Sequence, residues 1–300
     1  MLKWSRPDLA FITENSGILR SVKRAGSDTA PANIFLLAPK YDTQTAAQDG
    51  AVFRYYNGSK PNRRGYGFPI APEPSDLPAL IETLYRDANE RGVPLEFCLC
   101  DERQKAALDS VCTIDWNCTD DDSDYIYKKE SLASLAGKKL HRKRNHINNF
   151  MRVYDDIRYS PISRENSEDA VKIAELWLKE RENADADELA EFGCIKLAAK
   201  NIDALGLVGG VLYVGSEPAA MTIASHITAQ IADVHYEKSY GEYAENGGFT
   251  MINRLFSESL PEECDLINRE EDMGIEGLRA AKESYFPAFK LKKYYGVYRC

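Results

Sequence analysis

Two clusters of charged residues in the C-terminal half have the side-chain types that acid–base and electrostatic catalysis need. His235 and Glu237 stand two residues apart in an apolar run, and an unbroken strand would place both side chains on one face. Arg269-Glu270-Glu271-Asp272 directly follows a second apolar run, 264–268. A carboxylate can take the proton of an attacking hydroxyl or amine, and a guanidinium can stabilise the tetrahedral oxyanion. If the two runs form neighbouring strands, both clusters converge on one cleft.

Within this cleft we predict catalytic roles for Glu237, Asp272 and Arg269, with His235 and Glu270 in contact with the substrate. Glu237 and Asp272 are the candidate proton acceptors, and Arg269 orients a carboxylate or stabilises the oxyanion. The alternative is an ion-pair network at the edge of the sheet, because ion-pair networks also cluster charged residues.

Two further cations lie on a predicted helix, 276–285. Arg279 and Lys282 are three residues apart and share a helix face with Glu283. Because this helix follows the second cluster, we predict that Arg279 and Lys282 bind a phosphate or carboxylate of the substrate. Surface salt bridging is the alternative.

The elements that must position these residues alternate between strands and helices in both halves. Apolar runs bounded by Gly, Pro and Asn predict strands, and apolar residues at helical spacing predict helices. The sequence therefore predicts an α/β protein with mixed sheets covered by helices. The predicted strands are 34–38, 51–56, 66–70, 93–100, 124–128, 207–214, 219–227, 231–237, 264–268 and 290–299, and the predicted helices include 77–88, 167–182 and 186–205.

A basic segment, 131–154, joins the two halves and is predicted to form one amphipathic helix. Its apolar stripe contains Leu140, Ile147, Phe150, Met151 and Tyr154, while Lys143 intrudes on that stripe. Cations line the opposite face, where we expect the phosphates of a polyanion to bind through Lys138, Lys139, Arg142 and His146. A solvated linker helix is the alternative. We therefore predict that the chain forms two domains, residues 1–130 and 157–300, joined by a junction helix over residues 131–156.

Composition narrows the class of protein. The 300 residues carry 38 basic and 47 acidic side chains, a net charge of −9, which argues against a general nucleic-acid coat. No apolar stretch is long enough to span a bilayer, and the N-terminus lacks the apolar core of a signal peptide, so we expect a soluble, cytoplasmic protein. The seven cysteines have no CxxC spacing and are expected to be reduced. We expect no metal site, and the acidic turn 119–124 is predicted to be solvated.

Two long motifs, 137–150 and 268–287, the latter followed by Lys292-Lys293-Tyr294, resemble the phosphatidylglycerol lysyltransferase C-terminal family. The runs 33–41 and 65–70 look like those of its standalone members. The resemblance implies two tandem acyltransferase domains of the GNAT kind. It also implies transfer of an aminoacyl group from aminoacyl-tRNA to an acceptor such as a lipid head group. This sequence lacks the multi-span membrane domain of the membrane-bound synthases.

Three functional hypotheses follow. The leading one is an aminoacyltransferase that takes its donor from aminoacyl-tRNA, needs no cofactor and acts on a small-molecule, peptide or lipid-head-group acceptor. The second is a CoA-dependent N-acyltransferase using acyl-CoA. Against it, the segment 238–243 departs from the phosphate-binding loop of that fold and is flanked by glutamates. The third is a catalytically silent binding protein with the same fold.

Overall fold

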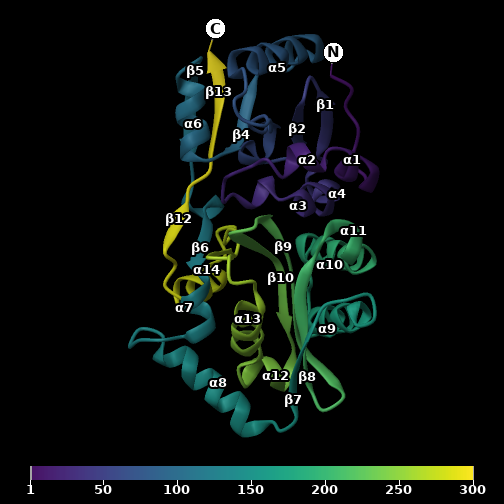
Figure 1. Cartoon of the computed structure of the whole chain (residues 1–300), viewed down its shortest axis with the longest axis vertical. Coiled ribbons are helices and arrows are strands. Elements are labelled where there is room, and N and C mark those ends of the chain that lie inside the picture. Colours follow the sequence, from purple (N-terminus) through teal and green to yellow (C-terminus); the bar gives the residue numbers. More distant parts are fainter. Residues whose placement is uncertain (1, 300) are drawn as a thin grey trace. The chain divides into compact units, whose positions relative to one another are not determined.

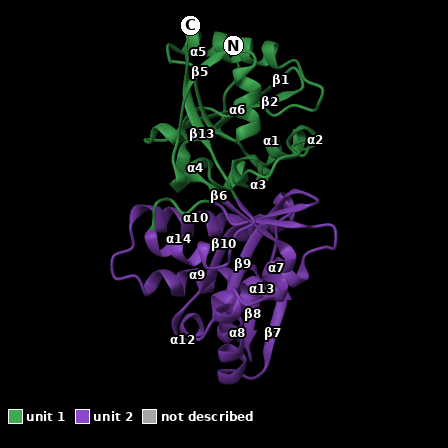
Figure 2. Cartoon of the chain, turned by 90° about the vertical axis from the view of Figure 1, so that its left-hand side faces the viewer, with its two compact units in different colours: residues 1–124, 271–275, 290–300 green, residues 125–270, 276–289 purple. Residues whose placement is uncertain are grey.

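The computed structural model describes residues 2–299, and the chain divides into two compact units (Figures 1 and 2). Unit 1 contains residues 1–124, 271–275 and 290–300, and unit 2 contains residues 125–270 and 276–289. These boundaries differ from the predicted division, because the junction segment 131–156 lies wholly in unit 2 and the C-terminal strand returns to unit 1. A division into consecutive segments cannot describe a chain whose last strand completes its first sheet.

Unit 1 is built on a six-stranded mixed sheet. The last strand of the chain, β13, lies between β4 and β5 and is antiparallel to both. In sheet order the strands are β1 (Gln44–Gln48), β2 (Ala51–Asn57), β3 (Arg64–Tyr66), β4 (Glu96–Cys100), β13 (Tyr294–Arg299) and β5 (Thr113–Cys118).

Short helices accompany this sheet. The predicted strand at 34–38 is wrong, because Pro31 begins helix α3, whose apolar residues Ile34 and Leu36 are buried. An apolar run this short fits a buried helix turn as well as a strand. The α-helices are α1 (Leu9–Glu14), α2 (Ser16–Leu19), α3 (Pro31–Leu36), α4 (Ala38–Tyr41), α5 (Leu77–Arg91) and α6 (Glu102–Asp109), and the 3₁₀ turns are Ser27–Thr29, Pro61–Arg63 and Asp120–Asp122.

Unit 2 is organised around a seven-stranded mixed sheet (Figure 1). Its hairpin β8–β9 and strand β10 confirm the three strands predicted between 207 and 237. In sheet order the strands are β12 (Phe289–Leu291), β6 (Asp124–Lys128), β11 (Leu266–Asn268), β10 (Ile231–Ser239), β9 (Glu217–Thr228), β8 (Val208–Val214) and β7 (Ile157–Pro161).

Helices cover both faces of this sheet. On one face α13 buries Ile252 and Phe256 against Ala232 and Val234 of β10, while α9 and α10 lie on the other face (Figure 1). The helices are α7 (Lys129–Ser134), α8 (His141–Val153), α9 (Ser167–Lys179), α10 (Ala186–Lys200), α11 (Ile202–Leu205), α12 (Gly241–Glu245), α13 (Gly248–Ser259) and α14 (Glu276–Glu283). No helix within residues 2–299 is long and apolar enough to cross a membrane.

The predicted single helix over 131–154 is two helices. Leu135 and Gly137 adopt left-handed backbone conformations, with φ of 49° and 85°, and they separate α7 from α8. Leu140, Ile147 and Phe150 of the predicted apolar stripe are buried, but Met151 is 56% exposed. The stripe is therefore narrower than its periodicity indicates.

Candidate active site

The site lies where two neighbouring strands of unit 2 stop pairing. Strands β10 and β11 run parallel and pair through only three residues of each, ending at Asp233 and Asn268. His235 and Glu237 lie on β10 beyond this point, and Arg269 and Glu270 directly follow β11. Ligands of open α/β sheets commonly bind beyond the carboxyl ends of such strands.

A β-bulge separates the two predicted residues of β10. The register of β10 against β9 shifts between Val234 and Tyr236, so alternation is interrupted at His235. His235 consequently contacts Asp233 and Glu270, whereas Glu237 contacts Arg269. The expectation of one shared face assumed an unbroken strand, and the bulge instead gives the two side chains separate partners.

The first set of contacts is centred on Arg269. Its Nη2 donates to Glu237 Oε1 at 2.8 Å, and the amide of Asn253, on α13, donates to Glu237 Oε2 at 2.9 Å. The guanidinium lies 4.9 Å from the ring centre of Tyr285 and 5.7 Å from that of Tyr127. Its Nη1 is buried and has no hydrogen-bond partner among residues 2–299. The two N–H groups of Nη1 therefore have no acceptor among the described residues and can donate to a ligand.

Lys143 of α8 lies beside this guanidinium. Its Nζ is 3.8 Å from the ring centre of Tyr285. Burial and the positive charge of Arg269 lower the pKa of Lys143 to about 8. The intrusion of Lys143 into the apolar stripe thus has a structural reason, since that stripe faces the aromatic residues of the site.

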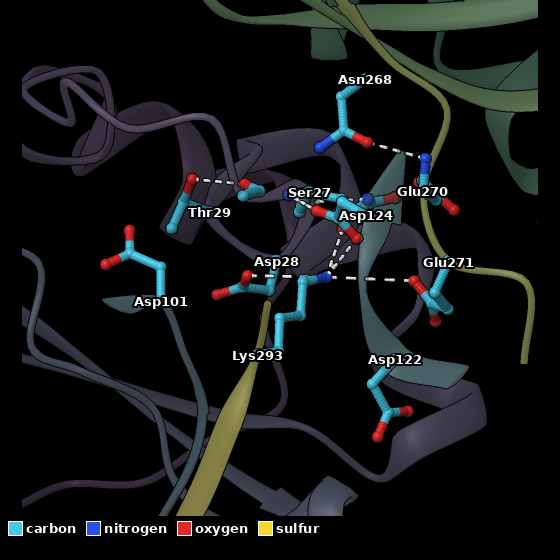
Figure 3. Close-up of polar contacts among 12 residues, drawn as sticks. Ser27, Asp28, Thr29, Asp101, Asp122, Asp124, Asn268, Glu270, Glu271 and Lys293 are labelled. Carbon is cyan, nitrogen blue, oxygen red and sulfur yellow. Dashed lines mark hydrogen bonds and ion pairs between the residues drawn. The ribbon is translucent and has the colours of Figure 1, made fainter. Parts of the chain in front are cut away.

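The second set of contacts is centred on His235. Its Nδ1 lies 3.2 Å from Glu270 Oε1 and 3.5 Å from Asp233 Oδ2. On the other side of the ring, Nε2 lies 2.8 Å from the hydroxyl oxygen of Ser225 on β9. The side chain of Asn268 accepts the backbone N–H of Glu270 at 2.7 Å, which holds this residue in place (Figure 3).

Helix α14 holds the same segment in place through the side chain of Lys282. Lys282 is buried and donates to the carbonyl oxygens of Arg269 and Glu270 at 2.6 and 3.1 Å. Lys282 therefore forms neither the surface salt bridge nor the anion-binding site that the sequence indicated. Its ammonium instead fixes the backbone of Arg269 and Glu270. Arg279 is half-buried on the same helix.

Asp272, the predicted base, belongs to unit 1, whereas Glu237 belongs to unit 2. Asp272 is fully buried and accepts the backbone N–H of Gly274 at 2.9 Å. Its shared cleft with Glu237 stays a prediction.

The predicted phosphate-binding residues lie at the start of α8 and just before it. Lys138, Lys139, Arg142 and His146 are all exposed. Within residues 2–299 the first three form no ion pair, so their positive charges are available to a polyanion. Burial and the charges of Lys143 and Arg142 lower the pKa of His146, so His146 adds less positive charge than the other three.

Unit 1 contains a charged cluster that the sequence analysis missed (Figure 3). Lys293 is 3% exposed, and its Nζ lies 2.6 Å from Asp124 and 2.8 Å from the hydroxyl of Ser27. Arg63 pairs with Glu271 at 2.7 Å and with Asp122 at 3.5 Å. The acidic turn was predicted to be solvated, but Asp122 and Asp124 are buried because these cations neutralise them. The pKa of Lys293 is raised because Asp124 and Glu271 outweigh the effect of burial.

The contacts that complete the candidate site come from residues that carry no motif. Strand pairing brings Ser225 to His235, and helix packing brings Asn253 to Glu237, and no sequence spacing reveals either contact. Two residues did give a signal: Asp233 lies two residues before His235 on the same strand, and Lys143 is a cation on an otherwise apolar stripe.

Comparison with known proteins identifies the fold and the family. A crystal structure of a conserved protein of unknown function from Bacteroides thetaiotaomicron has a TM-score of 0.89 at 30% identity and covers 100% of both chains. The structure of L-PGS from Bacillus licheniformis has a TM-score of 0.67 at 15% identity over 98% of this chain and 92% of that one. FemX has a TM-score of 0.61 at 9% identity, covering 98% and 97%. These likenesses confirm the predicted tandem GNAT-type acyltransferase fold.

An uncharacterized protein from Mycoplasmoides gallisepticum is 27% identical over 178 residues, which are 57% of this chain and 55% of that protein. The match thus spans about half the length of this relative. Residues 19–296 match the family model described as phosphatidylglycerol lysyltransferase, C-terminal. This match includes every residue of the candidate site and all strands of both sheets except the end of β13, and the chain belongs to the phosphatidylglycerol lysyltransferase C-terminal family.

Proposed function

We propose that this protein transfers an aminoacyl group from aminoacyl-tRNA to an amine or hydroxyl acceptor at the site beyond β10 and β11. The family description names a lysyltransferase, and the fold is that of acyltransferases. The acceptor is a small molecule, a peptide or a lipid head group, and the reaction needs no cofactor because the ester of aminoacyl-tRNA is already activated.

The observation that carries the proposal is the unpartnered Nη1 of Arg269. A buried guanidinium donor without a partner costs free energy unless a ligand accepts its hydrogen bond. An ester carbonyl oxygen would accept this bond, and the bond would strengthen as that oxygen becomes an oxyanion. The salt bridge to Glu237 fixes the orientation of the guanidinium for this purpose.

In the proposed reaction the ester bond to tRNA breaks, a new amide or ester bond to the acceptor forms, and one proton moves from the acceptor to tRNA. The acceptor nitrogen or oxygen attacks the carbonyl carbon, the tetrahedral oxyanion collapses, and the ribose hydroxyl of tRNA leaves with the proton that the acceptor loses. Both carboxylate oxygens of Glu237 already accept hydrogen bonds, which suits Glu237 to orient Arg269. Asp272 is the predicted base, and Lys143 is a second candidate because a pKa of about 8 leaves part of its population neutral.

The donor can be tested by thermal melting in the presence of aminoacyl-tRNA, deacylated tRNA and acetyl-CoA. We expect aminoacyl-tRNA to raise the melting temperature more than deacylated tRNA does, because only the ester reaches Arg269. Arg269→Lys should remove this difference while general tRNA binding remains. The matched control is Arg158→Lys, at an exposed arginine of β7 in the same unit. A shift with acetyl-CoA alone would favour the CoA-dependent reaction, and no shift with any of the three would contradict the proposal.

A further inference from the structure

Near the point where β10 and β11 stop pairing, three side chains with metal-binding atoms lie close together. The proposed transfer reaction gives none of the three a role. One ligand atom from each of Asp233, His235 and Glu270 lies within 4.8 Å of the other two. The side chains of Asp233 and His235 are 0% and 1% exposed, and that of Glu270 is 22% exposed. Buried charges of this kind are paired or coordinate metals, because isolated ones are costly to bury.

The orientation of the His235 ring makes the convergence informative. In the tautomer whose Nε2–H donates to Ser225, Nδ1 carries a lone pair that faces oxygens of both carboxylates, at 3.2 and 3.5 Å. Three acceptors that face one another repel unless a positive charge lies among them. An imidazole nitrogen with two carboxylate oxygens is a common donor set for zinc and similar cations.

The distances also suit a metal. In a tetrahedral zinc site with bonds of about 2.1 Å, neighbouring ligand atoms lie about 3.4 Å apart. The two separations from His235 Nδ1 bracket this value, and the carboxylate oxygens of Asp233 and Glu270 lie within 4.8 Å of each other. Ser225 has the position of an outer partner that fixes the ring of a metal-binding histidine.

We propose that Asp233, His235 and Glu270 bind a divalent transition-metal cation, for which Zn²⁺ is the appropriate probe. Glu270 is the most exposed ligand and marks the side from which the ion and a fourth, water ligand enter. The hydrogen bond from Glu270 N–H to Asn268 and the bond from Lys282 to the Glu270 carbonyl hold this ligand in place. A bound ion would link β10 to the segment after β11.

The competing interpretation needs no metal. In it the Ser225 hydroxyl donates to Nε2, and Nδ1–H donates to Glu270. The proton on Nδ1 then takes the place that the metal ion would occupy. The two interpretations differ in whether the protein takes up an ion, which can be measured without any assay of transfer.

The test is calorimetric titration of Zn²⁺ into the full chain after treatment with EDTA and alkylation of exposed thiols. We expect one ion per chain, and a melting temperature that rises with Zn²⁺ and falls again with EDTA. His235→Gln should remove this binding, and Ser225→Ala should weaken it about 10- to 100-fold. His226→Gln is the matched control, because it changes a histidine on the adjacent strand β9 that is outside the cluster.

Wild-type protein that takes up no Zn²⁺ would overturn the proposal, whatever the variants do. Equal binding by wild type and a folded His235→Gln protein, with the fold checked by circular dichroism, would also overturn it. The metal test measures ion uptake and not transfer. A protein that takes up no Zn²⁺ would therefore not contradict the proposed transfer reaction, and a protein without transfer activity would not contradict the metal site.

Discussion

At the scale of single residues, Lys143 shows how the environment of the site changes the chemistry of a common side chain. Its ammonium lies against the Tyr285 ring and near the Arg269 guanidinium, and its pKa is lowered from 10.5 to about 8. Below pH 8 it is protonated in both the folded and the unfolded state. Above that value the folded state releases this proton first.

The lowered pKa of Lys143 predicts a particular dependence of stability on pH. Between pH 8 and 10.5 the unfolded state binds more protons at Lys143 than the folded state does, so its contribution to the free energy of unfolding rises with pH. The free energy of unfolding of wild type minus that of Lys143→Met should therefore increase across this window. Urea unfolding of both proteins at several pH values measures the difference. A flat difference would show that the pKa of Lys143 is not shifted, and a falling one that folding raises this pKa; either result would contradict the prediction.

Asp272 permits a separate prediction about the base. Asp272→Asn keeps the shape of the side chain but removes its ability to accept a proton. If Asp272 is the base, turnover should fall by about 100-fold or more while donor affinity changes little, because the lost interaction belongs to the transition state. Steady-state kinetics with aminoacyl-tRNA measure both quantities. Full activity in the variant would mean that Asp272 is not the base and that another group, such as Lys143, takes the proton.

At the scale of elements, the strands and helices were largely predictable, and their interruptions were not. Alternation and helical spacing located β8, β9, β10 and α5, because these elements are long and regular. The bulge at His235 and the break at Leu135 depend on contacts with neighbouring elements, which leave no periodic trace. The separation of His235 from Glu237 could therefore not be predicted from their spacing.

Helix α8 and the residues before it carry a prediction about tRNA. Replacing Lys138, Lys139 and Arg142 by Gln should weaken tRNA binding and reduce the slope of log affinity against log salt by up to about 3, since each lost phosphate contact removes about one released counterion. Fluorescence anisotropy with labelled tRNA at several salt concentrations measures this slope.

The control for this experiment removes the same charge elsewhere in unit 2. Lys172 and Lys179 of α9 and Lys196 of α10 are exposed, and their joint replacement by Gln should leave most of the binding intact. Equal losses in the two triple variants would mean that tRNA responds only to net charge, and α8 would then have no specific role.

At the scale of the whole molecule, unit 1 is held together by residues far apart in the sequence. Lys293, from the last tenth of the chain, contacts Ser27 and Asp124 (Figure 3). Arg63 contacts Glu271. The family resemblance predicted the fold, but composition and spacing could not show that an acidic turn is buried. That outcome depends on which cations the fold brings to the turn.

The buried cluster predicts a large effect on stability. Lys293→Met keeps most of the side-chain volume but leaves Asp124 buried without its cation, which should destabilise the protein by about 3–5 kcal/mol. In contrast, Arg86→Ala breaks an exposed pair with Glu82 on α5 and should change stability by less than about 1 kcal/mol. Urea unfolding measures both values. Similar small effects from the two changes would show that the cluster contributes little to stability.

Arg269 is proposed to act on the ester of aminoacyl-tRNA, and a transfer assay measures that reaction itself. Radiolabelled aminoacyl-tRNA is incubated with the protein and, in separate reactions, phosphatidylglycerol vesicles or a low-molecular-mass cell extract, and the label is followed from tRNA to product. We predict that wild type moves label to an acceptor and that Arg269→Lys does so about 100- to 1000-fold more slowly, as expected for a lost oxyanion donor. Label that stays on tRNA at the rate seen without protein, or equal transfer by both proteins, would contradict the claim.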